Sequence, residues 1–175
     1  MKHLKYHSLF ALTLLLPIVA GCAGEQRLPG MPPLHPVFIT VEQDGNPLAG
    51  ATVTLLGNDE VTRQWPAGGV TDTNGVAQMR TSGRFEGAAA GQFRVMVDKT
   101  ERPINPYEAH TESDSPHFQD FLREQRIVEA NTFIVIDPRF SSNDTPLTIE
   151  VVRGQRNYSV DVSPAVRIRP AAGSD

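Results

Sequence analysis

Histidine, serine and acidic residues gather in one stretch of the chain, and their types are those of a catalytic or metal site. His110 and His117 flank a Ser-Asp-Ser-Pro segment at residues 113–116. A catalytic serine needs a positioned histidine and an orienting acid, but the sequence lacks a G-x-S-x-G nucleophile elbow. Glu108, His110 and His117 offer zinc donors without H-E-x-x-H spacing or cysteines. We expect polar loop residues here, with no metal or cofactor; a hydrolase using both histidines is the disfavoured alternative.

The single cysteine, Cys22, carries a different kind of chemistry. One cysteine cannot form an intramolecular disulfide or a multi-cysteine metal site. Upstream, Lys2 and Lys5 precede an apolar run at residues 9–16. That run is shorter than the roughly 20 apolar residues of a membrane span, and small residues follow it before Cys22. The pattern predicts a secretion signal rather than a transmembrane helix.

The residues around the cysteine resemble the bacterial lipobox. Val19-Ala20-Gly21-Cys22 has an aliphatic residue and two small residues before the cysteine. The resemblance implies that residues 1–21 are a lipoprotein signal peptide and that Cys22 carries acyl chains, which hold a protein at a bilayer surface. It also implies an envelope protein anchored in the membrane and facing the periplasm. Ala23 after the cysteine favours the outer membrane over the inner one.

Beyond the anchor, the sequence divides into a tether and one domain. Residues 22–36 are rich in proline and predict an extended tether, with a first edge strand plus loop as the alternative. The whole chain has 175 residues with 14 Gly and 14 Pro. Removal of residues 1–21 leaves 14 basic and 20 acidic residues, a net charge of −6. This acidity argues against a nucleic-acid partner, which calls for a basic patch.

Period-2 alternation of apolar residues predicts strands along residues 37–162. It is clear at residues 37–42, 51–56, 93–98, 147–152 and 157–162, with turns at Asp44-Gly45-Asn46-Pro47 and Asp72-Thr73-Asn74-Gly75. A hairpin turn is expected at residues 153–156. Residues 100–131 interrupt the pattern as an insert in which Ser115-Pro116 starts a helix. That helix would pack on the sandwich or over a sheet edge. We expect an antiparallel β-sandwich and a flexible tail at residues 163–175, in which Val166 and Ile168 could extend an edge.

Two segments resemble carboxypeptidase-regulatory-like, transthyretin-like domains. Residues 41–53 match an apolar strand followed by D-G-x-P-L-x-G-A, and residues 69–75 match a T-D-x-x-G turn. The ending at residues 136–157 resembles small bacterial lipoproteins built on this domain. The resemblance implies a seven-stranded transthyretin-like (prealbumin-like) sandwich without a generally known activity. A shared fold does not carry function.

Two further features each have a structural and a functional interpretation. Asp72-Thr73-Asn74-Gly75 begins like a calcium loop but lacks the later ligands, so we expect a turn. Trp65 is the only tryptophan, and it either contacts a partner or plugs the end of the core, which we favour. The resulting expectation is a non-enzymatic envelope lipoprotein that binds an envelope protein or serves a structural role. The alternative is a carbohydrate- or cell-wall-binding module.

Overall fold

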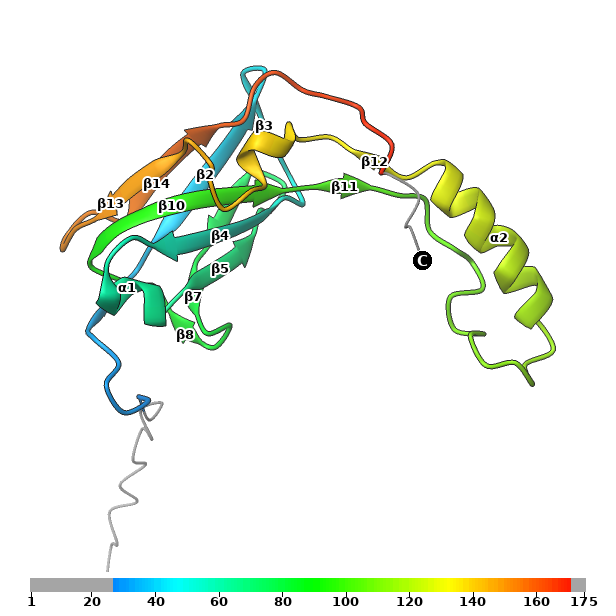
Figure 1. The fold of residues 1–175 in the computed structure, drawn as a ribbon, viewed down its shortest axis with the longest axis horizontal. Helices are drawn as coiled ribbons and strands as arrows, with labels where there is room; N and C mark the ends of the chain where they lie inside the picture. The colour runs from blue at the N-terminus through cyan, green and yellow to red at the C-terminus, as the bar shows by residue number, and fades with distance from the viewer. Residues whose placement is uncertain (1–26, 171–175) are drawn as a thin grey trace, which may run out of the picture.

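The computed structural model describes residues 27–170, and two β-sheets form the body of the domain (Figure 1). The larger sheet has the strand order β13 (Thr148–Val151), β10 (Gly91–Asp98), β4 (Thr52–Gly57), β5 (Ala67–Val70), β7 (Arg80–Thr81) and β8 (Phe85–Glu86). The smaller sheet has the order β14 (Asn157–Asp161), β2 (Phe38–Gln43) and β3 (Asn46–Pro47), and β6 (Val76–Gln78) also pairs with β2. The all-β sandwich expected from the sequence is therefore confirmed.

The core forms between the sheets because alternate residues of each strand point inward. In β10, Phe93, Val95 and Val97 are fully buried, and in β2 Ile39 and Val41 are fully buried. These side chains belong to one apolar cluster that draws on both sheets. The residues that alternate in the sequence are thus buried on one face of each of these strands.

One strand pair departs from the antiparallel expectation. β14 runs parallel to β2, with Tyr158 opposite Ile39 and Val160 opposite Val41. The hairpin expected at residues 153–156 is accordingly wrong, because β13 pairs with β10 in the larger sheet and β14 with β2 in the smaller one. Residues 152–156 form a corner that carries the chain from one sheet to the other, with Gly154 at φ +94°.

The predicted turn after β2 follows from its sequence. Asp44 and Gly45 both have positive φ, 51° and 75°, which is the requirement of a two-residue type I′ hairpin and explains the Asp-Gly pair. Asp44 also ties this turn to the C-terminal segment. Its backbone N–H donates to Ser163 Oγ at 2.7 Å, and its carboxylate accepts from the N–H of Ala165 at 3.1 Å.

Two short helical segments lie at the ends of the sheets. Helix α1 (Glu60–Gln64) begins at a capping box in which Asp59 accepts from the N–H of Thr62 at 2.8 Å. It packs on Gly57, where a Cβ would stand 2.2 Å from the Thr62 carbonyl carbon. The 3₁₀ turn η1 (Pro138–Phe140) buries Phe140 in the core.

The domain begins before Val37, inside the segment expected to be a tether. Strand β1 (Leu34–His35) pairs with β9 (Ala88–Ala89), and Leu34 packs against the core. Residues 22–36 are therefore not a tether throughout, because their last residues complete an edge. The alternative of a first edge strand is correct for residues 34–35. Residues 27–33 contain no strand or helix.

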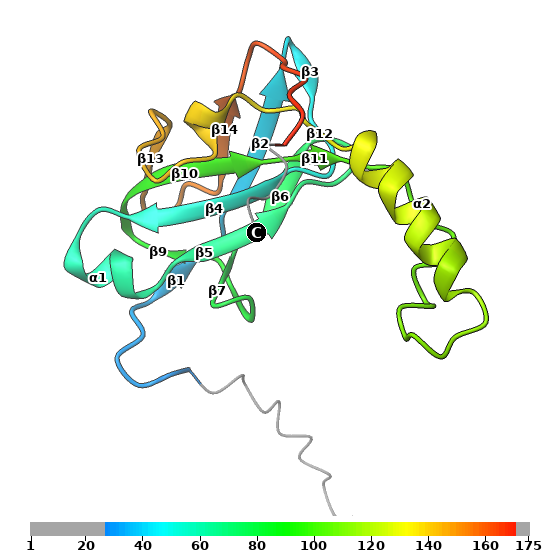
Figure 2. The ribbon, with the colours of Figure 1, turned by 45° about the vertical axis from the view of Figure 1, so that its right-hand side comes forward.

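The insert forms an arm that stands away from the sheets in both ribbon views (Figures 1 and 2). Its base is the pair β11 (Thr100–Glu101) and β12 (Phe133–Ile134), and its tip carries helix α2 (Phe118–Ala130). The expectation that this helix packs on the sandwich is wrong. The loop before it supplies its packing, since buried Asn105 donates to the Phe121 carbonyl and to Gln125 Oε1, both at 3.3 Å.

The helix begins two residues after Pro116, with His117 at the N-cap position and without a side-chain capping bond. In the sequence of the helix, Gln125 interrupts an apolar stripe made by Phe118, Phe121, Leu122 and Val128. The contact with Asn105 explains this polar position. Residues 163–170, expected in a flexible tail, run beside the arm's base. Ile168 exchanges backbone hydrogen bonds with Ile134 at 2.8 and 2.9 Å, so Ile168 extends an edge.

We predict that Gly87→Ala destabilises the domain much more than Gly83→Ala. Both glycines have positive φ, +94° and +70°, so both substitutions carry the strain of about 1–2 kcal/mol of a left-handed residue. A Cβ at Gly87 would also stand 2.1 Å from the His35 carbonyl oxygen, whereas nothing lies within 4 Å at Gly83. Urea denaturation should show an additional loss of roughly 2 kcal/mol or more for Gly87→Ala. Equal losses would contradict the β1 contact.

Candidate functional site

The residues singled out by the sequence do not form one site. Cys22 lies outside the described residues. Trp65 is half-buried at the C-terminal end of α1. It does not belong to the buried core, so the expectation that it plugs the core is wrong, because the apolar residues of the two sheets already fill the interior.

The structure does bring His110 and His117 together. Their ring centroids are 5.0 Å apart in an edge-on contact, and the ring of Tyr107 stacks on His117 at 5.7 Å. His110 Nδ1 lies 3.0 Å from Ser115 Oγ, and His117 Nδ1 lies 3.5 Å from a carboxylate oxygen of Asp120. Asp120 also pairs with Arg123 at 3.2 Å.

This arrangement divides the parts of a catalytic triad between two histidines. A triad needs the acid and the serine on opposite nitrogens of one imidazole, but here Ser115 contacts His110 and Asp120 contacts His117. The zinc donors are also separated, because Glu108 pairs with Arg102 at 3.0 Å. Among residues 27–170, no group of three or more His, Cys, Asp or Glu is placed to hold a metal ion. The cluster is a packed loop at the N-terminal end of α2.

The Asp72 segment is a turn, as predicted. One carboxylate oxygen of Asp72 accepts from the backbone N–H groups of Asn74 and Val76, both at 2.9 Å. These bonds lower the pKa of Asp72 below its usual value, with the bond from Val76 the largest cause. Gly75 has φ +73°, and a Cβ there would stand 2.8 Å from the Val41 carbonyl oxygen. Local geometry therefore accounts for the aspartate and the glycine.

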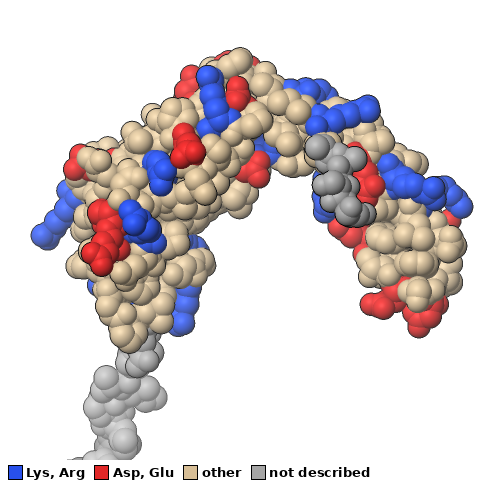
Figure 3. Space-filling view, in the orientation of Figure 1, with Lys and Arg blue, Asp and Glu red and all other residues tan. Residues whose placement is uncertain are grey.

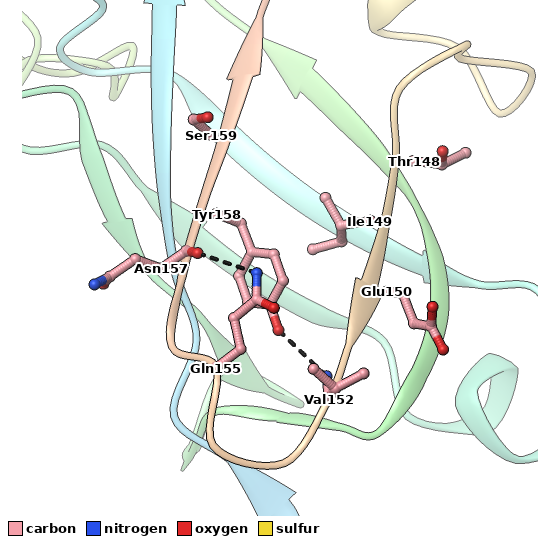
Figure 4. Close-up of a pocket in the computed structure, with 8 residues that line it drawn as sticks. All are labelled: Thr148, Ile149, Glu150, Val152, Gln155, Asn157, Tyr158 and Ser159. Carbon is pink, nitrogen blue, oxygen red and sulfur yellow. Dashed lines mark hydrogen bonds between the residues drawn. The ribbon is translucent and has the colours of Figure 1, made fainter.

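A groove opens on the side of the sandwich where β13 and β14 part (Figure 4). Its volume is about 600 Å³. The side chain of Tyr158 lies between the two strands and is almost fully buried, with 9% of its surface exposed. Ile149 is partly buried and packs against the core. The lining is Thr148, Ile149, Glu150, Val152, Gln155, Asn157, Tyr158 and Ser159.

Strand β14 has one free edge, which faces away from β2. The N–H of Phe38 donates to the Arg156 carbonyl at 2.7 Å, and the N–H of Val162 donates to the Glu42 carbonyl at 2.9 Å. Backbone groups of successive residues alternate between the two sides of a strand. The residues between Arg156 and Val162 that point away from β2 are therefore Asn157, Ser159 and Asp161.

Strand β13 has a free edge on the same side of the sandwich. The N–H of Val95 donates to the Leu147 carbonyl at 2.9 Å, and Ile149 stands opposite Phe93. The same alternation directs the backbone groups of Thr148 and Glu150 away from β10. Among the described strands, β13 pairs with β10 alone and β14 with β2 alone. Two unpaired edges thus border one groove.

Side chains cover part of these edges at the corner. The hydroxyl of Tyr158 accepts from the N–H of Val152 at 3.2 Å, and Gln155 Nε2 donates to the Asn157 carbonyl at 3.5 Å (Figure 4). The remaining outward groups have no such cover among residues 27–170. Unpaired edges are templates for a further strand, so the groove is a candidate binding site.

The sequence did not reveal this groove. The alternation at residues 147–151 and 158–162 predicts both strands, but a hairpin and a crossing corner share the same turn residues. Pairing with β2 or β10 depends on residues distant in sequence. The alternation therefore does not show whether the two strands pair with each other or join different sheets.

No protein-family model, curated protein or solved structure matches this chain. Within residues 27–170, no helix is both long and apolar enough to cross a membrane.

We predict that Asp72→Ala destabilises the domain at neutral pH and that the difference from the natural chain shrinks in acid. The folded-state pKa of Asp72 is lowered, so its ionised form adds stability above the unfolded pKa of about 3.9. That stability disappears as the pH falls through the lower folded pKa. Urea denaturation at several acidic pH values and at neutral pH measures the effect. A difference that persists at the lowest pH would contradict it.

Proposed function

We propose that this protein is a non-enzymatic lipoprotein of the bacterial cell envelope. Residues 1–21 are removed as a signal peptide, and Cys22 carries the acyl chains that attach the chain to the outer membrane, facing the periplasm. The positive residues Lys2 and Lys5, the short apolar run and Val19-Ala20-Gly21 before Cys22 support this assignment. Residues 27–33 lead away from the sheets without helix or strand, which suits a spacer after an anchor (Figure 1).

The domain is a transthyretin-like, carboxypeptidase-regulatory-like sandwich in this proposal. Seven of the described strands have three or more residues: β2, β4, β5, β6, β10, β13 and β14. The two sequence signatures lie at turns, Asp44-Gly45 between β2 and β3 and Asp72-Thr73-Asn74-Gly75 between β5 and β6. Both observations concern the fold and not the function.

The function is protein binding through the open side of the sandwich. The observation that carries it is the groove bordered by the free edges of β13 and β14. Main-chain edges bind extended segments of other proteins by adding a strand. The visible face carries basic and acidic side chains interspersed, unlike the continuous basic stripe of nucleic-acid-binding proteins (Figure 3).

The groove favours a protein partner over a glycan. Trp65, the residue for sugar stacking, does not line the groove. The hydrolase alternative is likewise weakened, because Ser115 and Asp120 contact different histidines. The glycan and hydrolase alternatives therefore receive no support from the groove.

We predict that Cys22→Ala abolishes lipid attachment. The thiol is the chain's only acylation site of this kind, so the variant should not incorporate a labelled fatty acid. It should also leave the membrane fraction without detergent, because the acyl chains supply the membrane affinity. Ala23→Ser is the matched control and should label normally. Labelling of Cys22→Ala at the level of the natural chain would contradict the anchor.

We predict that a photocrosslinking residue at Ser159 captures envelope proteins in cells, whereas one at Arg123 does not. Ser159 lies on the free edge of β14, and Arg123 is exposed on the arm, away from the groove. Mass spectrometry of the crosslinked products identifies the partners. Equal capture at both positions, or capture at Arg123 alone, would contradict binding through the groove.

A further inference from the structure

The two edges of the groove are unequal. β14 directs the backbone N–H and carbonyl groups of three residues away from β2: Asn157, Ser159 and Asp161. Of these groups, only the Asn157 carbonyl is covered, by the side chain of Gln155. β13 directs Thr148 and Glu150 outward. Its edge cannot extend further upstream, because Pro146 has no N–H. An added strand therefore finds more main-chain partners on β14.

A strand added to β14 would lie over the apolar floor of the groove. Its side chains would alternate, and one set would face the larger sheet. On that side lie Ile149, which is half-buried, and the ring of Tyr158, which stands between the two strands (Figure 4). Apolar side chains at every second position of the added strand would complete this burial.

Two carboxylates lie at the edges of the site, Glu150 in the lining of the groove and Asp161 two residues beyond Ser159 on β14. Asp161 and Glu150 are exposed, and neither makes an ion pair among the described residues. Hydrogen bonds from Ser163, chiefly from its hydroxyl, lower the pKa of Asp161 and keep it ionised. The groove lining contains no lysine or arginine; Arg153 and Arg156 lie on the corner. Opposite charges on neighbouring strands stabilise a sheet, so a basic side chain opposite Asp161 fits.

The C-terminal residues beyond the described part of the chain supply no suitable occupant. Residues 171–175 are Ala-Ala-Gly-Ser-Asp, which lack β-branched and aromatic residues. They follow Ile168, which pairs with β12 at the arm's base, away from the groove (Figure 1). A second copy paired along the same edge would offer only Asn157, Ser159 and Asp161 from its own β14, so neither Asp161 carboxylate would meet a basic side chain. A basic partner leaves no such charges unbalanced.

We propose that the groove binds an extended segment of another protein, which adds to the free edge of β14 with alternating apolar and basic side chains. The apolar residues face Ile149 and Tyr158, and a lysine or arginine stands opposite Asp161. This inference rests on the proposed function and names the chemistry of the partner.

The probe is a short fluorescent peptide in which valine and lysine alternate, added to the full chain purified in detergent and followed by fluorescence anisotropy. Ser159→Pro removes an outward N–H of β14 without touching the bonds to β2, a placement that edge strands tolerate. Thr148→Pro removes the corresponding N–H of β13 and is the matched control. A peptide with glutamate in place of lysine tests the charge.

We expect the lysine peptide to bind, with affinity lowered at least about tenfold by Ser159→Pro and changed less than about twofold by Thr148→Pro. The double variant Glu150→Lys/Asp161→Lys should lose the lysine peptide and gain the glutamate peptide. This exchange keeps the test decisive if Ser159→Pro does not fold. Loss of binding in Thr148→Pro but not in Ser159→Pro would overturn the choice of edge.

Equal binding of the lysine and glutamate peptides, or of neither, would overturn the proposed chemistry. A peptide-free dimer that Ser159→Pro dissociates, seen by sedimentation, would overturn it in favour of a second copy. If the peptide fails but crosslinking at Ser159 still captures an envelope protein, the proposed function stands and only the partner's chemistry is wrong. Failure of both would reject the groove itself.

Discussion

The parallel pairing of β14 with β2 determines most of what is distinctive in this molecule. Tyr158, Val160 and Val162 are buried on the inner face of the smaller sheet, while Asn157, Ser159 and Asp161 point outward. A shift of one residue would reverse these faces, so burial fixes the register. Because β14 crosses to β2, it cannot pair with β13, and the side of the sandwich between them stays open. The groove is a consequence of this crossing.

An open side is useful for binding but favours non-specific pairing between proteins. The structure limits the exposed edge in two ways. At the corner, Tyr158 and Gln155 occupy backbone groups of Val152 and Asn157. Beyond it, Asp161 and Glu150 place negative charge beside the remaining groups. The partial cover at the corner and the two carboxylates beyond it restrict which segment can add to β14.

The arm shows how residues suited to chemistry can serve local packing. His110 and His117 contact each other and Tyr107, and each ring uses its Nδ1 on a different neighbour, Ser115 or Asp120. Asn105 binds Gln125 and joins the loop to α2. This internal network lets the helix stand away from the sandwich without an apolar sheet beneath it. The polar residue in the helix stripe has a structural partner in the arm.

The sequence by itself determined the strands and the tight turns, since alternation and positive-φ residues act over a few neighbours. Val95 and Val97 predicted a buried face, and Asp44-Gly45 and Asp72 predicted turns that the structure confirms. Tertiary structure alone decided the partner of β14, the position of α2 and the role of Leu34 as the start of an edge. Each of these depends on contacts between residues far apart in the chain. Periodicity shows which face of a strand is buried, but it does not show which strand lies beside it.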